Sequence, residues 1–140
     1  MRILCLTFLL CLTSTSHAAT ATLTLGKAHA QAEIADTPHS REHGLMRRTR
    51  LCADCGMVFV YEQAAQLSFW MKDTPLPLSI AFINADGRIL NIAEMLAATT
   101  NLHASLGTAR YALEMNSGWF ARHGIVPGVR VTGLERLRAE

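Results

Sequence analysis

Two prolines one residue apart, Pro75 and Pro77, define a short crossing between two apolar runs of this chain. Proline restricts its own φ angle and disfavours helical backbone for the residue before it, so this segment must be extended and stiff. The runs that it joins are then the end of one strand, Phe69–Met71, and the whole of the next, Leu78–Ile83. We call residues 70–77 the Pro loop, and its polar side chains beside a tryptophan make it the first place to expect a site.

Other short apolar runs, separated by turn residues, continue this pattern. Residues 19–29 are expected to form a lead-in or an edge strand, and a single domain to span residues 30–136. Alternation of apolar and polar residues over 29–35 predicts a half-buried strand. Asp86-Gly87, set between two apolar runs, is typical of a hairpin turn. Further strands are predicted at residues 57–61, 66–71, 110–115 and 128–134, and a loop at residues 95–109.

Two short helices complete the expected elements. Thr37 as an N-cap followed by Pro38 at the first helical position predicts a helix that runs to about Arg47. A second helix is expected over 118–123, with Gly124 as its C-terminal cap. The fold class is therefore α+β and β-rich, with about seven short strands and two short helices. Because the unpaired backbone groups of an exposed sheet edge can pair with other chains, we expect a compact barrel-like sheet or a sandwich.

Residues 1–18 have the pattern of a cleaved export signal. A basic residue is followed by an apolar run over 3–12, and residues 16–18 end in a small-x-small cleavage pattern. The run is about ten residues, whereas crossing a bilayer takes roughly twenty. We expect cleavage after Ala18, a periplasmic or secreted location, and no membrane span in the mature chain. A lipoprotein site at Cys11 is disfavoured because Leu10 stands where a small residue is needed.

The charge of the chain is nearly balanced. Thirteen Lys and Arg against eleven Asp and Glu give +2, and loss of Arg2 with the signal leaves +1. Such a balance does not favour nucleic acid as a partner. The expected partner is a small ligand or another protein.

Five sequence blocks occur together in this chain, and their combination is more specific than any one of them. The blocks are Arg41-x-x-Gly44-Leu45-Met46-x-Arg48, Gly56-Met57-x-Phe59, Trp70-Met71-Lys72-x-Thr74-x-x-Pro77-Leu78, Phe82-Ile83-x-x-Asp86-Gly87 and Leu113-Glu114-x-x-x-Gly118. In this the chain resembles the DUF192 family of small, often secreted prokaryotic domains without an established biochemical function. The resemblance covers roughly residues 30–135. It implies a compact barrel-like α+β fold and no assigned catalytic residues.

Three positions depart from the pattern of that family. Asp73 stands where the family usually has Asn, and Ser79 and Val129 stand where it usually has Asp. If these family positions line a shared pocket, this chain has an altered one.

Cys52 and Cys55 are the two cysteines that remain after signal cleavage. A structural disulfide is the favoured interpretation, since the family does not require cysteines here and an export compartment permits disulfides. One alternative is a redox dithiol acidified by the arginines at 47, 48 and 50. The other is a zinc site that adds His39 and His43, four residues apart on the first helix. A disulfide would remove the thiolates that zinc needs, so these interpretations exclude one another, and no cofactor is expected if the disulfide forms.

The Pro loop offers a different kind of site. Lys72 together with Arg41 or Arg48 would clamp an anionic group that Asp73 orients, and the alternative is that the arginines form ion pairs that pin the helix to the sheet. Because neighbouring strand residues face opposite ways, Trp70 and Met71 cannot both point inward, and we expect Trp70 to face outward. The predicted ligand-binding residues are Arg41, Arg48, Trp70, Lys72, Asp73 and Thr74.

Glu114 is an acid within an otherwise apolar strand. A buried carboxylate must be paired or protonated, and we expect a scaffold salt bridge rather than an acid with a raised pKa. No Ser-His-Asp set, phosphate-binding loop or paired-carboxylate motif stands at recognisable spacing. The sequence therefore favours a non-enzymatic, exported binding module, with a thiol-redox or zinc protein as the alternative.

Overall fold

The structure is a computed structural model that describes residues 18–140. The predicted export signal lies outside these residues, apart from Ala18, and stays a prediction. The elements are β1 (Thr20–Leu25), β2 (Ala28–Ala35), α1 (Pro38–His43), β3 (Cys55–Phe69), β4 (Leu78–Ile83), β5 (Ile89–Met95), β6 (His103–Asn116), α2 (Trp119–Arg122), β7 (Val131–Thr132) and a final 3₁₀ turn, Leu134–Arg136. Within this part of the chain, no helix combines the length and apolar character that crossing a membrane requires.

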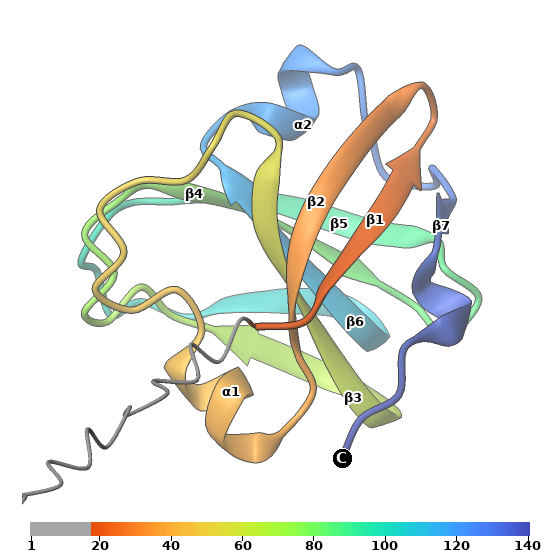
Figure 1. The fold of residues 1–140 in the computed structure, drawn as a ribbon, viewed down its shortest axis with the longest axis horizontal. Helices are drawn as coiled ribbons and strands as arrows, with labels where there is room; N and C mark the ends of the chain where they lie inside the picture. The colour runs from red at the N-terminus through yellow and green to blue at the C-terminus, as the bar shows by residue number, and fades with distance from the viewer. Residues whose placement is uncertain (1–17) are drawn as a thin grey trace, which may run out of the picture.

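The seven strands form one sheet in the order β5-β4-β6-β3-β2-β1-β7. Neighbouring strands are antiparallel except for the parallel pair β2 and β3. The sheet curls until its two edges meet at a bridge between Arg88 and Arg130, where the Val131 amide also donates to the Gly87 carbonyl at 2.7 Å (Figure 1). The predicted β-rich, barrel-like fold with two short helices is confirmed, and the sheet protects its edges by curling.

The central strands β3, β6 and β4 are covered on both faces. On one face, Ala81 and Ile83 of β4 belong to a cluster that fills the inside of the curl, which we call the inner core. On the other face, Ile80 and Phe82 belong to a second cluster, the outer core, with Leu45 from the segment after α1. All six residues of β4 are buried, which explains why its sequence is an almost unbroken apolar run.

Several predicted elements differ in extent from the observed ones. Residues 57–61 and 66–71 belong largely to one strand, β3, whose pairing register with β6 shifts between Val60 and Ala65. The polar residues at this shift are exposed and interrupt the apolar pattern. The predicted loop 95–109 is wrong from His103 onward, since β6 begins there with mostly exposed residues that carry no strand periodicity.

The helix limits also differ. The capping box of α1 is as predicted, with the Thr37 hydroxyl accepting from the Ser40 amide at 3.1 Å. The helix ends at His43 rather than near Arg47, because Gly44 has a positive φ of 50° and leaves the helical path. The predicted strand 128–134 is reduced to β7, whose two residues lie between glycines with positive φ at 128 and 133.

We predict that Gly56→Ala destabilises the fold far more than Gly124→Ala. A Cβ at Gly56 would lie 2.1 Å from the Glu114 carbonyl oxygen and 2.4 Å from the Met115 sulfur, so β3 and β6 must separate. We expect a loss of roughly 3 kcal/mol in the free energy of unfolding from this overpacking. At Gly124 nothing lies within 4 Å and only the positive φ of 66° opposes alanine, for about 1–2 kcal/mol. Equal losses in urea unfolding would contradict the close strand contact.

Candidate functional site

Two adjoining hollows lie between α1 and the Pro loop. The outer one, which we call the groove, has a volume of about 330 Å³ and is lined by His39, Glu42, His43, Met46, Trp70, Lys72 and Asp73. The deeper one, which we call the well, has a volume of about 180 Å³. The two share Glu42, His43, Met46 and Trp70 as lining residues, so the groove continues into the well.

The well is lined by aromatic rings and by several polar groups. Phe59, Tyr61, Phe69 and Trp70 supply the rings. The rings of Phe59 and Phe69 meet edge to face, with centroids 4.8 Å apart. The charged and hydroxyl groups in the lining are those of Arg41, Glu42, His43, Tyr61, Ser68, Thr74 and Glu114. The well thus combines aromatic walls with many polar groups, and small-molecule sites likewise pair apolar walls with placed polar groups.

The Pro loop is held in place by its backbone. The Met71 amide donates to the Thr99 carbonyl at 3.0 Å, and the Thr74 carbonyl accepts from the Ala98 amide at 2.9 Å. The Asp73 carbonyl accepts from the Arg47 amide at 2.7 Å, and Asp73 itself has a positive φ of 54°. These bonds tie the loop both to the segment after β5 and to the segment after α1. The side chains of the loop are therefore presented from a fixed support.

Trp70 and Met71 face opposite ways as predicted, although β3 ends at Phe69, just before them. Met71 is fully buried in the outer core, whereas Trp70 is 46% exposed and lines both hollows. The Lys72 ammonium nitrogen lies 5.5 Å from the centroid of the Trp70 ring. This distance is typical of a cation–π contact, so the mouth of the groove already holds one alkylammonium group on an aromatic face.

The two arginines predicted to bind ligand are both engaged within the fold. Arg41 lines the well, and its guanidinium donates to the carbonyls of Asp36 and Val60 while lying 5.0 Å from the Tyr61 ring centroid. Arg48 lines neither hollow. It makes a bidentate pair with Glu33 at 2.7 and 2.8 Å, and this hydrogen bonding raises the pKa of the Arg48 guanidinium.

Glu114 lies near the C-terminal end of β6, between Met57 of β3 and Ile80 of β4, and lines the well from the sheet side. Its side chain is only 4% exposed. No hydrogen bond or ion pair to its carboxyl is found among residues 18–140, and each fully buried polar side-chain atom there has a partner. The carboxyl oxygens therefore open onto the well. Burial raises the pKa of Glu114 to about 8, so the group is mostly protonated at neutral pH.

The expected salt bridge of Glu114 is wrong, and the positions of the nearby cations explain why. Arg110 turns to the Tyr61 carbonyl and the Tyr111 ring, and Arg41 binds carbonyls at the other side of the well. The sequence identified Glu114 as unusual, but an acid in an apolar strand does not reveal whether a cation from another element reaches it. The sequence analysis left Glu114 out of the ligand site, together with lining residues such as Glu42 and Tyr61.

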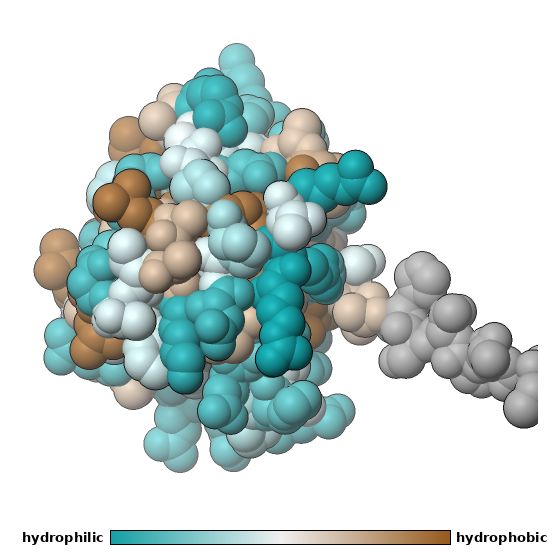
Figure 2. Space-filling model, turned by 90° about the vertical axis from the view of Figure 1, so that its left-hand side faces the viewer, coloured by the Kyte–Doolittle hydropathy of each residue, from teal (hydrophilic) through white to brown (hydrophobic). Residues whose placement is uncertain are grey.

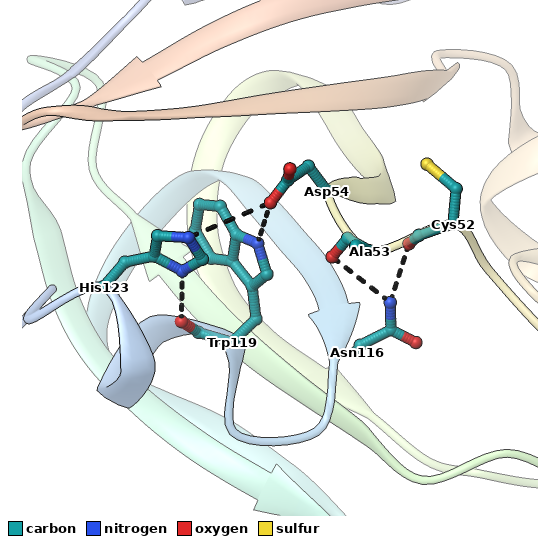
Figure 3. Close-up of polar contacts among 6 residues, drawn as sticks. All are labelled: Cys52, Ala53, Asp54, Asn116, Trp119 and His123. Carbon is teal, nitrogen blue, oxygen red and sulfur yellow. Dashed lines mark hydrogen bonds and ion pairs between the residues drawn. The ribbon is translucent and has the colours of Figure 1, made fainter.

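Cys52 and Cys55 lie at disulfide distance, with their sulfurs 2.03 Å apart, as the structural interpretation predicts. Figure 3 shows how the loop between them is held. The Asn116 side-chain amide donates to the Cys52 carbonyl at 2.8 Å, and the Trp119 indole donates to Asp54 at 2.9 Å (Figure 3). His123 lies over the Trp119 ring, with its Nε2 3.8 Å from the same Asp54 oxygen. The loop thus ties β3 to the end of β6 and to α2.

The four residues of the zinc alternative do not come together. His39 and His43 stack on α1 with ring centroids 6.3 Å apart and line the groove, whereas Cys52 and Cys55 are tied to the end of the molecule that carries α2. Figure 1 shows α1 and α2 at opposite ends of the curled sheet. In the part of the chain that is described, no three His, Cys, Asp or Glu side chains gather as a metal-binding group.

The three departures from the family pattern also occupy separate places. Asp73 lines the groove. The Ser79 hydroxyl donates to Glu94 at 2.6 Å and accepts from the Gly118 amide at 2.7 Å, so Glu94 places a carboxylate beside this position. Val129 packs against the inner core. They do not line one shared pocket, and only the first bears on the candidate site.

The comparisons with known proteins give a family and a fold. The model of the DUF192 family, described as "Uncharacterized ACR", matches residues 21–133. A crystal structure of a protein from Sinorhizobium meliloti 1021, provisionally described as a transcription regulator, is 34% identical with a TM-score of 0.80, over 83% of this chain and 95% of that one. A protein of unknown function from Novosphingobium aromaticivorans DSM 12444 is 32% identical with a TM-score of 0.80, over 84% of this chain and 88% of that one. None of the curated proteins matches this sequence.

Replacement of both Cys52 and Cys55 by serine tests the structural role of the disulfide. By the chain-entropy rule, a loop of this length adds about 2 kcal/mol of stability. We expect a loss of that size in denaturant unfolding, with the fold retained because Asn116 and Trp119 still hold the loop. A variant that fails to fold would show that the disulfide contributes much more than about 2 kcal/mol to the free energy of unfolding.

Replacement of Glu114 by glutamine tests the raised pKa. Since the pKa in the folded state, about 8, exceeds the ordinary value of 4.5, this group favours folding fully below pH 4.5 and progressively less up to pH 8. The total loss over that range is roughly 5 kcal/mol at 1.36 kcal/mol for each unit. Glutamine cannot titrate, so the fall in stability between pH 5 and pH 8 should be several kcal/mol smaller in the variant.

The control for that experiment is Glu62→Gln, which changes an exposed glutamate of β3. Its stability should follow the pH dependence of the parent protein. If Glu114→Gln also follows the parent curve, Glu114 is not a buried protonated acid.

Proposed function

We propose a ligand-binding function for this chain, which belongs to the DUF192 family. The site is the groove between α1 and the Pro loop, together with the well beneath it. The observation that carries the proposal is the buried, unpartnered carboxyl of Glu114, which opens onto a hollow lined by aromatic rings. A buried acid with a raised pKa that opens onto a hollow is a candidate functional residue, because an unpaired buried acid does not stabilise the scaffold.

The placement of the predicted residues supports this site. Five of the six residues that the sequence suggested for ligand binding line the two hollows, and only Arg48 does not. Trp70 is the natural anchor for a ligand, since it is a large half-exposed ring on a loop fixed by backbone hydrogen bonds.

The surface around the site is consistent with a small ligand. Figure 2 shows the side of the molecule on which the Pro loop lies in Figure 1, and its apolar side chains are scattered among polar ones. Leu96 and Leu102, in the segment between β5 and β6, are exposed apolar residues. A partner that needs a broad apolar interface is less favoured here than a ligand that enters a hollow.

We favour binding over catalysis because two hydroxyl groups of the well, those of Thr74 and Tyr61, are hydrogen-bonded or kept protonated. A catalytic reading needs a nucleophile and a base within hydrogen-bond reach. The Thr74 hydroxyl donates to the Lys72 carbonyl at 3.2 Å, and burial raises the pKa of Tyr61, so its phenol stays protonated. These features support a role in which the well receives part of a ligand without transforming it.

We also propose that the protein acts after export, in the periplasm or outside the cell. The signal pattern of residues 1–18 and the disulfide distance between Cys52 and Cys55 both support such a compartment. The regulator description belongs to the S. meliloti protein. The nearly balanced charge of this chain lends no support to nucleic-acid binding, which depends largely on neutralising phosphates.

Trp70→Ala and Lys72→Ala test the position of the site. The measurement is a fragment screen by NMR on the mature protein, followed by affinities for the fragments that shift the Trp70 indole signal. Loss of the ring should weaken such fragments about tenfold, equivalent to 1.4 kcal/mol, and loss of the ammonium should change affinity according to fragment charge. Val126→Ala, at a residue that is 57% exposed and lines neither hollow, is the control. Unchanged affinities in Trp70→Ala would place the ligand site elsewhere.

A further inference from the structure

We propose that the well selects ligands that carry an alkylammonium group, which enters between the aromatic rings and pairs with the carboxylate of Glu114. This inference rests on the proposed ligand-binding function and names the chemical class of the ligand. It depends on three observations about the well, namely an acid without a partner, rings that accept cations, and arginines that are already engaged.

The first observation is the carboxyl itself. Glu114 is 4% exposed, and the ion pairs found among residues 18–140 are Arg48 with Glu33 and His123 with Asp54, which leave Glu114 without a cation. A buried carboxylate is stable only when paired. Because the carboxyl opens onto the well, a ligand can supply the cation that the chain itself does not.

The second observation is the aromatic lining. Faces of aromatic rings attract ammonium and guanidinium groups, and aromatic cages bind such ligands in other proteins. In this site two rings already contact cations of the chain itself. The Lys72 ammonium nitrogen lies 5.5 Å from the centroid of the Trp70 ring, and the Arg41 guanidinium carbon lies 5.0 Å from that of Tyr61. Phe59 and Phe69 add apolar walls that fit the carbon chain of an alkylammonium ion.

The third observation concerns the alternative, an anionic ligand held by arginine. One terminal nitrogen of Arg41 already binds the carbonyls of Asp36 and Val60, and Arg48 lies outside both hollows. The groove is lined by Lys72 together with Glu42 and Asp73, and none of these three takes part in the ion pairs found among residues 18–140. In the described lining of the well, Arg41 is the only Lys or Arg, and its Nη1 already binds two backbone carbonyls.

The binding step has a proton balance that can be measured. At neutral pH the acid is mostly protonated, so pairing requires that Glu114 loses its O–H proton to solvent while the ligand keeps its ammonium protons. One proton is released for each ligand bound. The affinity should therefore increase about tenfold for each unit by which the pH is raised toward 8, and it should stay constant above pH 8. An anionic ligand would have the opposite dependence, because it would share the proton of Glu114.

Other titratable groups face the same space and must be separated from this effect. Arg41, Glu42 and His43 face the well from α1 and its end, and Tyr61 faces it from β3. His43 is the histidine among them. A His43→Gln variant, measured in parallel, removes its contribution to the pH dependence.

The experiment compares three probes of equal length on the mature protein, pentylammonium, pentanoate and pentanol. NMR shifts of the Trp70 indole give affinities from pH 6 to pH 9, and calorimetry in two buffers of different ionisation enthalpy counts the protons released. We expect pentylammonium to bind most tightly, with release of close to one proton at pH 7. In Glu114→Gln, its affinity at pH 9 should fall at least tenfold and lose its pH dependence, whereas Glu42→Gln should keep that dependence.

The outcomes separate this inference from the proposed function. If pentanoate or pentanol binds in the groove and pentylammonium does not, the ligand class is wrong and the site stands. Pentylammonium that binds without proton release, or equally well to Glu114→Gln, also overturns the pairing with Glu114. If no probe shifts the Trp70 signal at millimolar concentration, both the ligand class and the proposed site fail.

Discussion

The candidate site depends on the burial of β3, β6 and β4 on both faces. The inner core fills the inside of the curled sheet, and the outer core lies beneath α1, the segment that follows it and the Pro loop. Each residue of β6 between Tyr111 and Met115 is consequently buried, whichever way it points. An acid at Glu114 therefore loses its water because of the fold around it. The raised pKa and the well are two results of the same packing.

The sequence predicted the parts of the fold in which local chemistry and tertiary structure agree. The β4 run, the Asp86-Gly87 turn and the Thr37 cap were predicted correctly, because burial or backbone geometry restricts those residues directly. The first half of β6 was missed because its residues are mostly exposed, so apolar periodicity gives no signal there.

The candidate site was predicted in part for a similar reason. The outward position of Trp70 was predicted from alternation, a local rule that holds for the residues just past the end of β3 as well. Whether Glu114 has a partner depends on where Arg41 and Arg110 point, and these residues come from α1 and from another position of β6. Their guanidinium groups bind backbone carbonyls, which are available at almost any strand end. No sequence pattern distinguishes that choice from a salt bridge.

The two ends of the molecule have different roles in this account. At the end with α2, the Cys52–Cys55 loop is fixed by Asn116 and Trp119, and its contacts are those of a structural tie (Figure 3). At the end with α1, the fixed Pro loop forms one side of the well. There the carboxyl of Glu114 has no partner among the described residues. Cys52 and Cys55 lie at disulfide distance, whereas the carboxyl of Glu114 has no partner among the described residues.

The most direct test of the central claim is an NMR titration of the Glu114 side-chain carboxyl carbon in the unliganded mature protein. The account predicts a titration midpoint near pH 8, because the group is buried and unpaired. A midpoint at or below the ordinary value of 4.5 would show a carboxylate that is solvated or paired, and would contradict the account.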